Sequence, residues 1–559
     1  MADNTPRIPW AQTISTRDSS MAADAIMYNY YASKNSDGRM FSERRFGLQT
    51  VYANTAGQAR GLFAFGTHVL AIIGTTFYVD GVATGGAVNG GSQYQFTLTG
   101  AGGTAVFLKN NTNAYTWNGT VLTAVTDPNY PANTVPGVAW LDGYVFVLTP
   151  AGALVNSNLN TPATWGALNT INGSLSPDPG AAVARLYNYV ASFGTFSTTF
   201  FYDAGNTPPG SPLLPNISAV VNVGCASGTS VVATENTIFW IGQTHQKGRK
   251  VYMFNGLSPQ PVSDEFIEKV LNGDPLTNVF AYYIEINGGV FYVLTLTASN
   301  CTLVYNAQAG MWSRWSSSAL GTPQNAAGAS VDAYGLVTVT LPNHGLNNPA
   351  VVQVTSTNSA AMYLGTFVVN VVDANTITYM ANAGAATGGI NSNTINTFTL
   401  DAEGVTNTVS VGLGQLTVTP YVQNFFNPEF YAYTNNTDYL LGATNGITYQ
   451  MQQGVSSDNG AFIYGLLRTN AGDFGSNNMK FFPHLEVIAD KVDDTAYLGY
   501  SDNDFDSFGS FRPVNLGAAR SMLKRCAASR RRAFSLLYIG GFQVRFYQLE
   551  MPNLSEGPL

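Results

Sequence analysis

The sequence predicts an all-β protein with a β-propeller-like body, an inserted small β-domain and an extended N-terminal arm. Two observations carry this prediction. Only 10% of the 559 residues are charged, whereas 57 residues are Gly and 12% are aromatic. A disordered chain would need high charge and few aromatic residues, and a helical bundle would need charged exposed faces. The second observation is a hairpin pattern that recurs along the chain, as it does in repeat architectures.

Residues 1–45 are expected to form the arm. They mix polar residues with a tyrosine cluster (Tyr28, Tyr30 and Tyr31) and lead into Ser42-Glu-Arg-Arg-Phe-Gly-Leu48. From there on, the alternation that is typical of strands takes over.

The propeller is expected to occupy residues 46–320 and to close with residues 413–559. Each repeat has a polar turn, a strand rich in Val, Phe and Tyr, a second turn and a second strand, and the repeats cover 67–81, 103–119, 143–160, 188–204, 230–256, 288–315 and 428–450. The three middle spacings agree with the roughly 40–50 residues of a four-stranded propeller blade. Such a blade buries both faces of its sheet against its neighbours, so it needs few charges. A stacked array of β-sandwiches would give a similar signal.

Residues 321–412 are expected to form the inserted domain. Residues 335–346 alternate between apolar and polar side chains, and residues 365–379 are rich in β-branched residues, so both segments are predicted to form strands. The flanking segments 321–330 and 381–396 have the Gly, Ala, Asn and Thr composition of linkers. A domain inserted at a loop tip of a larger scaffold explains this pattern.

One helix is predicted, over residues 263–271. Ser263 can cap its first turn, and Phe266, Ile267 and Val270 form an apolar stripe.

No motif for catalysis, a cofactor or a metal was found, and we expect a protein that is not an enzyme. The four histidines have no Cys or His partner at ligand spacing: His68, His245, His344 and His484. Asp502, Asp504 and Asp506 alternate as in a calcium loop, but Ser507 stands where that loop needs Gly. A solvated turn is the better interpretation, and Ser501 to Phe508 resembles a degenerate Asp-box, a folding turn of propellers. Nucleophile-elbow, P-loop and dinucleotide motifs are also missing.

The cysteines and the N-terminus indicate where the protein is made. Cys225, Cys301 and Cys526 are too few and too far apart for a disulfide framework. The N-terminal residues lack the basic and apolar segments of a signal peptide, and no apolar run is long enough for a membrane helix. We therefore expect a soluble protein assembled in the cytoplasm, without a membrane partner.

Charge is distributed unevenly. The formal net charge is −8, and between Gly61 and Gln246 the only basic residues are Lys109 and Arg185. Seven basic residues gather near the C-terminus with no acidic residue among them: Arg520, Lys524, Arg525, Arg530, Arg531, Arg532 and Arg545. This cluster is interpreted either as a patch that meets DNA or an acidic subunit, or as salt-bridged arginines that close the last strands.

Several segments resemble a known family. Ile238-Phe-Trp-Ile-Gly242, Gly248-Arg-Lys-Val-Tyr-Met-Phe-Asn-Gly256 and the predicted helix are similar to the core signature of P22-like packaged-DNA stabilisation proteins, the tail hubs of short-tailed phages. Three further stretches follow the order found in that family: 44–48, 305–315 and 481–550. The resemblance covers most of the chain outside 321–412.

The resemblance implies a structural virion protein of the phage tail, assembled in the host cytoplasm. Such a protein forms a ring of six copies below the portal and its adaptor, closes the channel, retains packaged DNA and docks a needle, tailspikes or fibres. It implies no enzymatic activity. We expect contacts with the DNA channel or with another subunit from Lys524, Arg525, Arg530, Arg531 and Arg532. We expect interface contacts from Arg44, Arg45, Phe46, Phe266 and Ile267.

A second hypothesis belongs to another functional class. A carbohydrate- or receptor-binding propeller, or a glycan hydrolase, would place an aromatic-lined cleft with convergent acidic residues on one propeller face.

Overall fold

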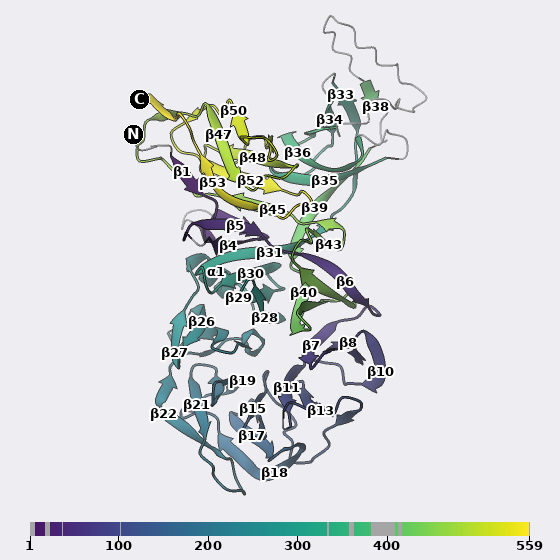
Figure 1. The fold of residues 1–559 in the computed structure, drawn as a ribbon, viewed down its shortest axis with the longest axis vertical. Coiled ribbons are helices and arrows are strands. Elements are labelled where there is room, and N and C mark those ends of the chain that lie inside the picture. Colours follow the sequence, from purple (N-terminus) through teal and green to yellow (C-terminus); the bar gives the residue numbers. More distant parts are fainter. Residues whose placement is uncertain are drawn as a thin grey trace, which may run out of the picture.

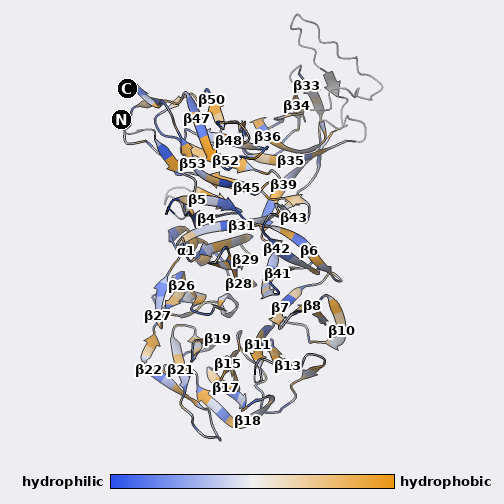
Figure 2. Ribbon diagram, viewed as in Figure 1, coloured by the Kyte–Doolittle hydropathy of each residue, from blue (hydrophilic) through white to orange (hydrophobic). Residues whose placement is uncertain are grey.

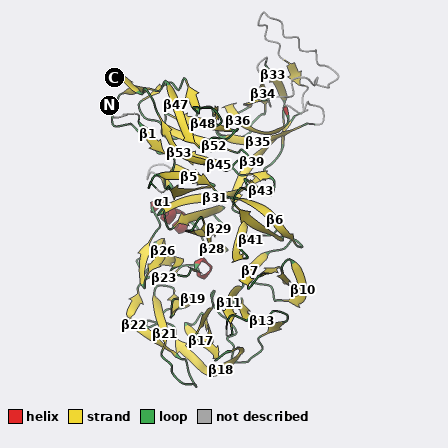
Figure 3. Ribbon diagram, viewed as in Figure 1, coloured by secondary structure: helices red, strands yellow, loops and turns green. Residues whose placement is uncertain are grey.

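The computed structural model describes residues 6–16, 23–35, 37–100, 102–246, 248–332, 335–356, 363–381, 409–411 and 416–557. Strands dominate these residues, which contain one α-helix, α1 (Glu265–Gly273), and one 3-10 turn, η1 (Gly228–Ser230) (Figure 3). The predicted all-β class is confirmed.

Seven groups of antiparallel strands are arranged in a ring within the described residues, and each group is one propeller blade (Figure 1). Blade 1 contains β7 (Ala59–Phe65), β8 (His68–Ile73), β9 (Thr76–Val79) and β10 (Val82–Ala87). Blade 2 contains β11 (Gln95–Thr99), β12 (Ala105–Lys109), β13 (Ala114–Trp117) and β14 (Leu122–Ala124). Blade 3 contains β15 (Ala139–Leu141), β16 (Tyr144–Leu148), β17 (Ala153–Asn158) and β18 (Thr161–Asn172).

The remaining blades complete the ring. They are blade 4 with β19 (Gly180–Leu186), β20 (Tyr189–Gly194), β21 (Thr198–Asp203) and β22 (Leu213–Val221), blade 5 with β23 (Gly224–Cys225), β24 (Val232–Ala233), β25 (Ile238–Gln243), β26 (Arg249–Asn255) and β27 (Ser258–Pro261), blade 6 with β28 (Val279–Ile286), β29 (Gly289–Leu296), β30 (Cys301–Asn306) and β31 (Met311–Leu320), and blade 7 with β40 (Pro428–Thr434), β41 (Thr437–Gly442), β42 (Ile447–Gln452) and β6 (Gly47–Ala53). All seven hairpins predicted from the sequence are found in these blades.

The ring is closed by pairing strands from opposite ends of the chain. β6 supplies the fourth strand of blade 7 and pairs antiparallel with β42, with Leu48 opposite Met451 and Gln49 opposite Gln450. The innermost strands contact one another in sequence, and β40 of blade 7 contacts β7 of blade 1. Closure leaves the ring without an unpaired break between its first and last blades.

A separate apolar core fills each space between adjacent blades. Blades 1 and 2 meet through Phe77 and Trp117, whose ring centroids are 5.1 Å apart, and blades 2 and 3 meet through Phe107 and Trp165 at 6.3 Å. The other five junctions have corresponding clusters. Figure 2 shows hydrophobic residues recurring along the strands of every blade. Packing of both faces of each sheet explains the low charge of the sequence.

Helix α1 packs its predicted apolar residues against blades 5 and 6. Ile267 and Leu271 are buried there, and Phe266 is half-buried. The predicted cap was wrong, because the cap is Asp264, whose carboxylate accepts a hydrogen bond from the Ile267 N–H at 3.0 Å. Ser263 instead accepts a hydrogen bond from Val251 N–H in blade 5.

The expected arm and residues 465–550 form a β-sandwich together. We call this body the terminal sandwich. One sheet contains β1 (Arg7–Pro9), β4 (Tyr30–Lys34), β5 (Met40–Arg44), β53 (Arg545–Glu550), β47 (His484–Ala489) and β50 (Met522–Lys524), and the other contains β3 (Ala23–Tyr28), β45 (Gly465–Arg468), β52 (Ala533–Tyr538), β48 (Thr495–Ser501) and β49 (Arg512–Asn515). A shared core, with Tyr30, Leu485 and Phe546 from one sheet and Leu498 and Phe534 from the other, joins the two.

Five short pairings complete the region around the sandwich. β2 (Ser15–Thr16) pairs with β3, β43 (Ser457–Asp458) pairs with β6 and with β44 (Ala461–Phe462), and β46 (Met479–Phe481) pairs with β51 (Ala528–Ser529) and β54 (Ser555–Gly557). Residues 413–559, which were expected to close the propeller, thus contribute the last blade and most of the sandwich.

The segment 321–412, expected as the inserted domain, leaves the propeller between blades 6 and 7 on a two-stranded stem. Its stem pairs β31 with β39 (Thr417–Phe425), and its body has β32 (Gln324–Asn325), β33 (Gly328–Val331), β34 (Leu336–Thr340), β35 (Ala350–Thr355), β36 (Gly365–Asp373), β37 (Thr376–Met380) and β38 (Val409–Val411). Buried residues such as Val339, Val352 and Ile377 form its own core. The predicted strands at 335–346 and 365–379 are confirmed, whereas most of the expected linker 381–396 lies outside the described residues.

This body also packs on the terminal sandwich. Phe511 N–H donates to Asn370 Oδ1 at 2.9 Å, and Val351 is buried in a cluster with Phe508 and Phe511. The two bodies therefore lie side by side above the propeller in Figure 1.

Candidate functional site

The basic C-terminal segment divides into two groups of side chains. Arg520, Arg532 and Arg545 form ion pairs with Glu486, Asp502 and Asp490, respectively. Lys524, Arg525, Arg530 and Arg531 are exposed. The interpretation as salt-bridged arginines therefore applies to the first three residues. The interpretation as a patch for an external anion can apply only to the other four.

Arg532 is held inside the sandwich. Its side chain is fully buried, and its guanidinium binds both carboxylate oxygens of Asp502 at 2.7 Å and donates to the Cys526 carbonyl. It lies over the rings of Tyr500 and Phe482, at 3.9 and 4.4 Å from their centroids. Such a planar fork between aromatic faces is a favourable site for a buried guanidinium.

Lys524 and Arg525 lie at the end of β50, at the end of the molecule away from the propeller (Figure 1), and Arg530 and Arg531 directly follow β51. Of these four cations, only Arg531 has an acidic partner within 4 Å among the described residues, and that partner is Asp504 at 3.6 Å. Both of these side chains are about half exposed, so the pair contributes little to stability. The four charges are therefore accessible to an external anion.

Asp502, Asp504 and Asp506 lie in the turn between β48 and β49. Asn503 Oδ1 accepts hydrogen bonds from Ser501 Oγ–H at 2.8 Å and Ser507 N–H at 3.1 Å. This geometry is that of a turn stabilised by its own side chains, as predicted. The described residues contain no group of three or more His, Cys, Asp or Glu that could hold a metal ion.

Arg44, Arg45 and Phe46 are buried where the propeller meets the terminal sandwich. Arg45 is fully buried and pairs with both oxygens of Asp458. Its guanidinium also donates to Asn29 Oδ1 at 2.9 Å and to the Ser316 carbonyl at 3.0 Å. Arg44 donates to the carbonyls of Gly540 and Ser456 at 2.6 and 2.7 Å. These contacts are made within one chain. Of the five expected interface residues, Phe266 keeps the largest accessible share, and Ile267 is buried.

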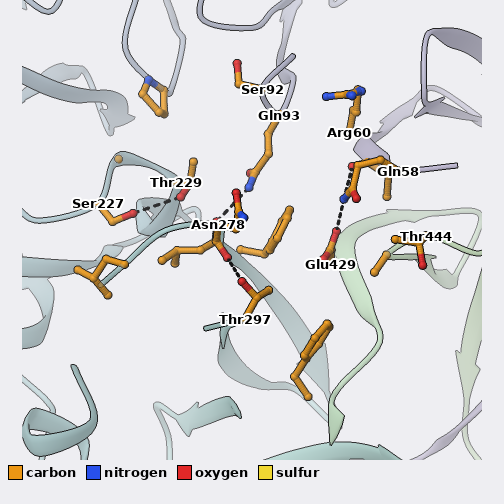
Figure 4. Close-up of a pocket in the computed structure, with 18 of the residues that line it drawn as sticks. Gln58, Arg60, Ser92, Gln93, Ser227, Thr229, Asn278, Thr297, Glu429 and Thr444 are labelled. Carbon is orange, nitrogen blue, oxygen red and sulfur yellow. Dashed lines mark hydrogen bonds between the residues drawn. The ribbon is translucent and has the colours of Figure 1, made fainter. Parts of the chain in front are cut away.

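A cavity of about 740 Å³ lies where the innermost strands converge, and sequence analysis did not identify it (Figure 4). Its lining comes from blades 1, 2, 3, 5, 6 and 7, mostly from the residues that precede or begin an innermost strand. No local pattern marks it, because the contributing residues extend from Gln58 to Thr444. We call it the axial cavity.

Two ionisable side chains line the axial cavity. Glu429 is almost fully buried and accepts a 3.3 Å hydrogen bond from Gln58 Nε2, and burial raises the pKa of its carboxyl to about 8. Arg60 lies next to Gln58 in Figure 4 and forms neither a hydrogen bond through its guanidinium nor an ion pair with any described residue. A single carboxyl is insufficient for the two-carboxylate mechanism of glycan hydrolysis.

Other lining residues are neutral hydrogen-bonding groups. Gln93 Nε2 donates to the Val279 carbonyl at 3.0 Å, and Thr297 Oγ1 donates to the Asn278 carbonyl at 3.0 Å. Among the described residues, the side chains of Asn278 and Thr444 have no hydrogen-bond partner. In addition, no helix in the described part of the chain is long and apolar enough to cross a membrane.

Comparison with known proteins gives one family. The model of a phage-stabilisation family, described as bacteriophage P22 Gp10, β-propeller, matches residues 26–340, more than half of this chain. No curated protein matches.

Similar solved structures are distant. The computationally designed Ika8 protein has 10% identity and a TM-score of 0.35, with coverage of 72% of this chain and 99% of that chain. The N-terminal domain of Nup159 has 9% identity and a TM-score of 0.34, with coverage of 77% and 98%. YCF48 bound to D1 peptide has 8% identity and a TM-score of 0.29, with coverage of 72% and 94%.

Proposed function

This chain belongs to the P22 Gp10 family of phage DNA stabilisation proteins, and from that premise we propose that it forms a six-copy ring in the phage tail that retains packaged DNA. In this proposal the ring lies below the portal adaptor, closes the channel without a catalytic step and docks a needle, tailspikes or fibres. The proposal rests on membership of a family of virion structural proteins and on the separation of charge along the molecule.

The observation is the separation of charge along the molecule. Lys524, Arg525, Arg530 and Arg531 are all exposed, and β50, which ends at Lys524, lies at the end of the molecule away from the propeller (Figure 1). In contrast, the first four blades contain three Lys or Arg residues, Arg60, Lys109 and Arg185, of which Lys109 is fully buried. Cations gathered at one end suit contact with DNA phosphates or an acidic adaptor, because phosphate binding depends on Lys and Arg and needs no base-specific groups.

Subunit contacts are assigned in this proposal to the outer strands of the blades. Ile217 on β22, Leu168 on β18 and Val82 on β10 are 76%, 64% and 68% exposed. Charge-poor surfaces with large apolar side chains resemble the cores of protein interfaces. The half-buried Phe266 remains a candidate contact, whereas Arg44, Arg45, Phe46 and Ile267 would support an interface from inside the fold.

A salt titration of DNA binding tests the cationic end. We expect the double variant Lys524→Gln/Arg530→Gln to bind duplex DNA more weakly and to lower the slope of log K against log salt by about 2, since each lost phosphate contact removes about 0.9. The matched control is Lys34→Gln/Arg39→Gln, which removes one Lys and one Arg that are exposed elsewhere. An unchanged slope in the first variant would contradict the assignment of these side chains to DNA.

Electron microscopy tests the ring. Purified protein mixed with its neighbouring tail proteins is expected to form closed rings with six-fold symmetry. Single copies or open chains in the presence of the adaptor would contradict the ring.

A further inference from the structure

The axial cavity has an uncompensated positive charge. Arg60 and Glu429 are the two side chains of its lining that can carry a charge. Burial raises the pKa of Glu429 to about 8, so this carboxyl is mostly uncharged at pH 7. The two side chains do not form an ion pair, and the Arg60 Nε is buried without a hydrogen-bond partner among the described residues. A guanidinium in this position lacks the carboxylate that would normally satisfy it.

The Arg60 guanidinium is also the only Lys or Arg side chain in blades 1 to 3 that is not fully buried. Lys109, the only other Lys or Arg in blades 1 to 3, is fully buried in blade 2 and donates hydrogen bonds to the carbonyls of Val135 and Gly137. Arg60 therefore faces the cavity as a single charge surrounded by neutral groups.

The rest of the lining offers hydroxyl and amide groups that are free to bind. Asn278 and Thr444 have side chains without a hydrogen-bond partner among the described residues, and the Ser92 hydroxyl accepts from Asn111 N–H and retains its own proton. In Figure 4, these residues lie around the same space as Arg60. Phe280 and Phe425 add apolar surface to the wall. The volume lies within the range of small-ligand pockets, about 300–1,000 Å³.

We propose that the axial cavity binds an acidic saccharide, with Arg60 holding the carboxylate of a uronic acid unit and Asn278, Ser92 and Thr444 binding its hydroxyls. A guanidinium binds a carboxylate through two parallel hydrogen bonds. Dispersed hydroxyl and amide groups match a ligand that has many hydroxyls and one charge. An acidic peptide would share only the carboxylate contact, and the several neutral groups favour the saccharide.

In this proposal the cavity binds the saccharide without hydrolysing it. Glu429 is the single carboxyl among the lining residues, and glycoside hydrolysis of the usual kind needs two on opposite sides of the bond. This inference does not depend on the proposed six-copy ring, because the cavity is formed within one chain.

Isothermal titration calorimetry on the full chain tests the proposal with three probes. Trigalacturonic acid is expected to bind, and maltotriose, a neutral saccharide of the same length, is expected to bind at least about tenfold more weakly because it lacks the carboxylate. Acetylated triaspartate amide, the peptide probe, is expected to bind more weakly than trigalacturonic acid. Equal or tighter binding of the peptide would overturn the saccharide assignment, and failure of trigalacturonic acid to bind would overturn the site.

Two variants locate the site. Arg60→Gln is expected to weaken trigalacturonic acid binding about tenfold or more, and Thr444→Val, a substitution of similar volume, is expected to weaken it severalfold. The matched control is Arg185→Gln in blade 4, which contributes no residue to the cavity. Thermal unfolding of each variant checks that it folds. An Arg60→Gln protein that folds and binds as tightly as the unmodified chain would overturn the role of Arg60.

Discussion

Buried arginines join the separate bodies of this molecule. Arg45 binds Asp458 while its backbone leads directly into β6, and it lies 4.6 Å from the centroid of the Phe426 ring. Arg44 crosses to the carbonyls of Gly540 and Ser456. Each guanidinium can donate several hydrogen bonds in one plane, so one side chain fixes several segments at once.

Removing one partner of the Arg45 pair should destabilise the fold strongly. Arg45→Met is expected to lower the free energy of unfolding by about 3–5 kcal/mol, because it leaves the Asp458 carboxylate mostly buried without its counter-charge. Urea denaturation measures this change. Arg39→Met, at a side chain that is 83% exposed, is the control and should change stability by less than about 0.5 kcal/mol. A similar small effect in both variants would contradict the joining role of Arg45.

Glu429 should make stability depend on pH. Burial raises the pKa of its carboxyl to about 8 in the folded protein, above the ordinary value of roughly 4.3. The folded state therefore binds more protons between these values, and the contribution of Glu429 to stability is lost as pH rises from about 5 to about 8. Glu429→Gln is expected to be more stable than the unmodified chain at pH 9, by an amount on the order of 5 kcal/mol.

Denaturation of both proteins between pH 5 and pH 9 measures this difference. Burial lowers the pKa of Lys109 to about 7, and this group acts in the opposite direction by favouring the folded state as pH rises above 7. The difference between the two proteins isolates Glu429, since Lys109 is present in both. A difference that does not change with pH would contradict this account, and Glu235→Gln at an exposed glutamate provides the control.

At the scale of elements, closure by β6 is the feature that makes the propeller a ring. The strand comes from the start of the chain and pairs with β42, near the end of the last blade. Its pairing with β42 joins segments about 400 residues apart in sequence, which stabilises the folded ring and constrains where both chain ends can go. β43 adds to the same sheet beyond β6.

A disulfide across this closure should stabilise the ring. Gln49 and Gln450 are directly opposite each other, and their side chains are hydrogen-bonded at 3.1 Å. Opposed residues in antiparallel strands have Cβ atoms about 4.5–5.5 Å apart, close to disulfide geometry. The oxidised Gln49→Cys/Gln450→Cys variant is expected to gain about 2–4 kcal/mol over its reduced form.

Denaturation in the presence and absence of reductant measures this gain. The three native cysteines are buried and free, so they should not exchange with the new pair. The single variant Gln49→Cys is the control and should show no dependence on reductant. If oxidation does not stabilise the double variant, the proposed importance of this closure is contradicted.

The sequence predicted those elements whose signal is local. The seven hairpins, the inserted strands and the helix over 263–271 each have an alternating or periodic pattern within a few residues of a turn. The pairing of β6 with β42 and of the arm with the terminal sandwich has no such signal, because partners such as Tyr30 and Phe546 are about 500 residues apart. The number of blades could not be predicted for the same reason.

The candidate sites divide in the same way. The cationic cluster was visible because its residues are neighbours in sequence, but Arg532 could not be separated from Arg530 and Arg531. Only the fold shows that Arg532 binds Asp502 and is buried. The axial cavity was missed because Arg60, Asn278 and Glu429 come from different blades and carry no shared motif.

At the scale of the whole molecule, a low-charge closed propeller lies at one end and an exposed cationic cluster at the other (Figure 1). The terminal sandwich and the inserted body pack against each other and lie side by side above the propeller. This arrangement provides separate surfaces for separate partners, which suits a protein that connects other components and retains DNA.

The retention of DNA by phage particles tests this central claim most directly. Particles assembled without this chain are compared with complete particles by the amount of DNA protected from nuclease over time. The account predicts that the incomplete particles package DNA and then lose it, and that the Lys524→Gln/Arg530→Gln variant restores retention only in part. Particles that keep their DNA without this chain, or that never package it, would contradict the account.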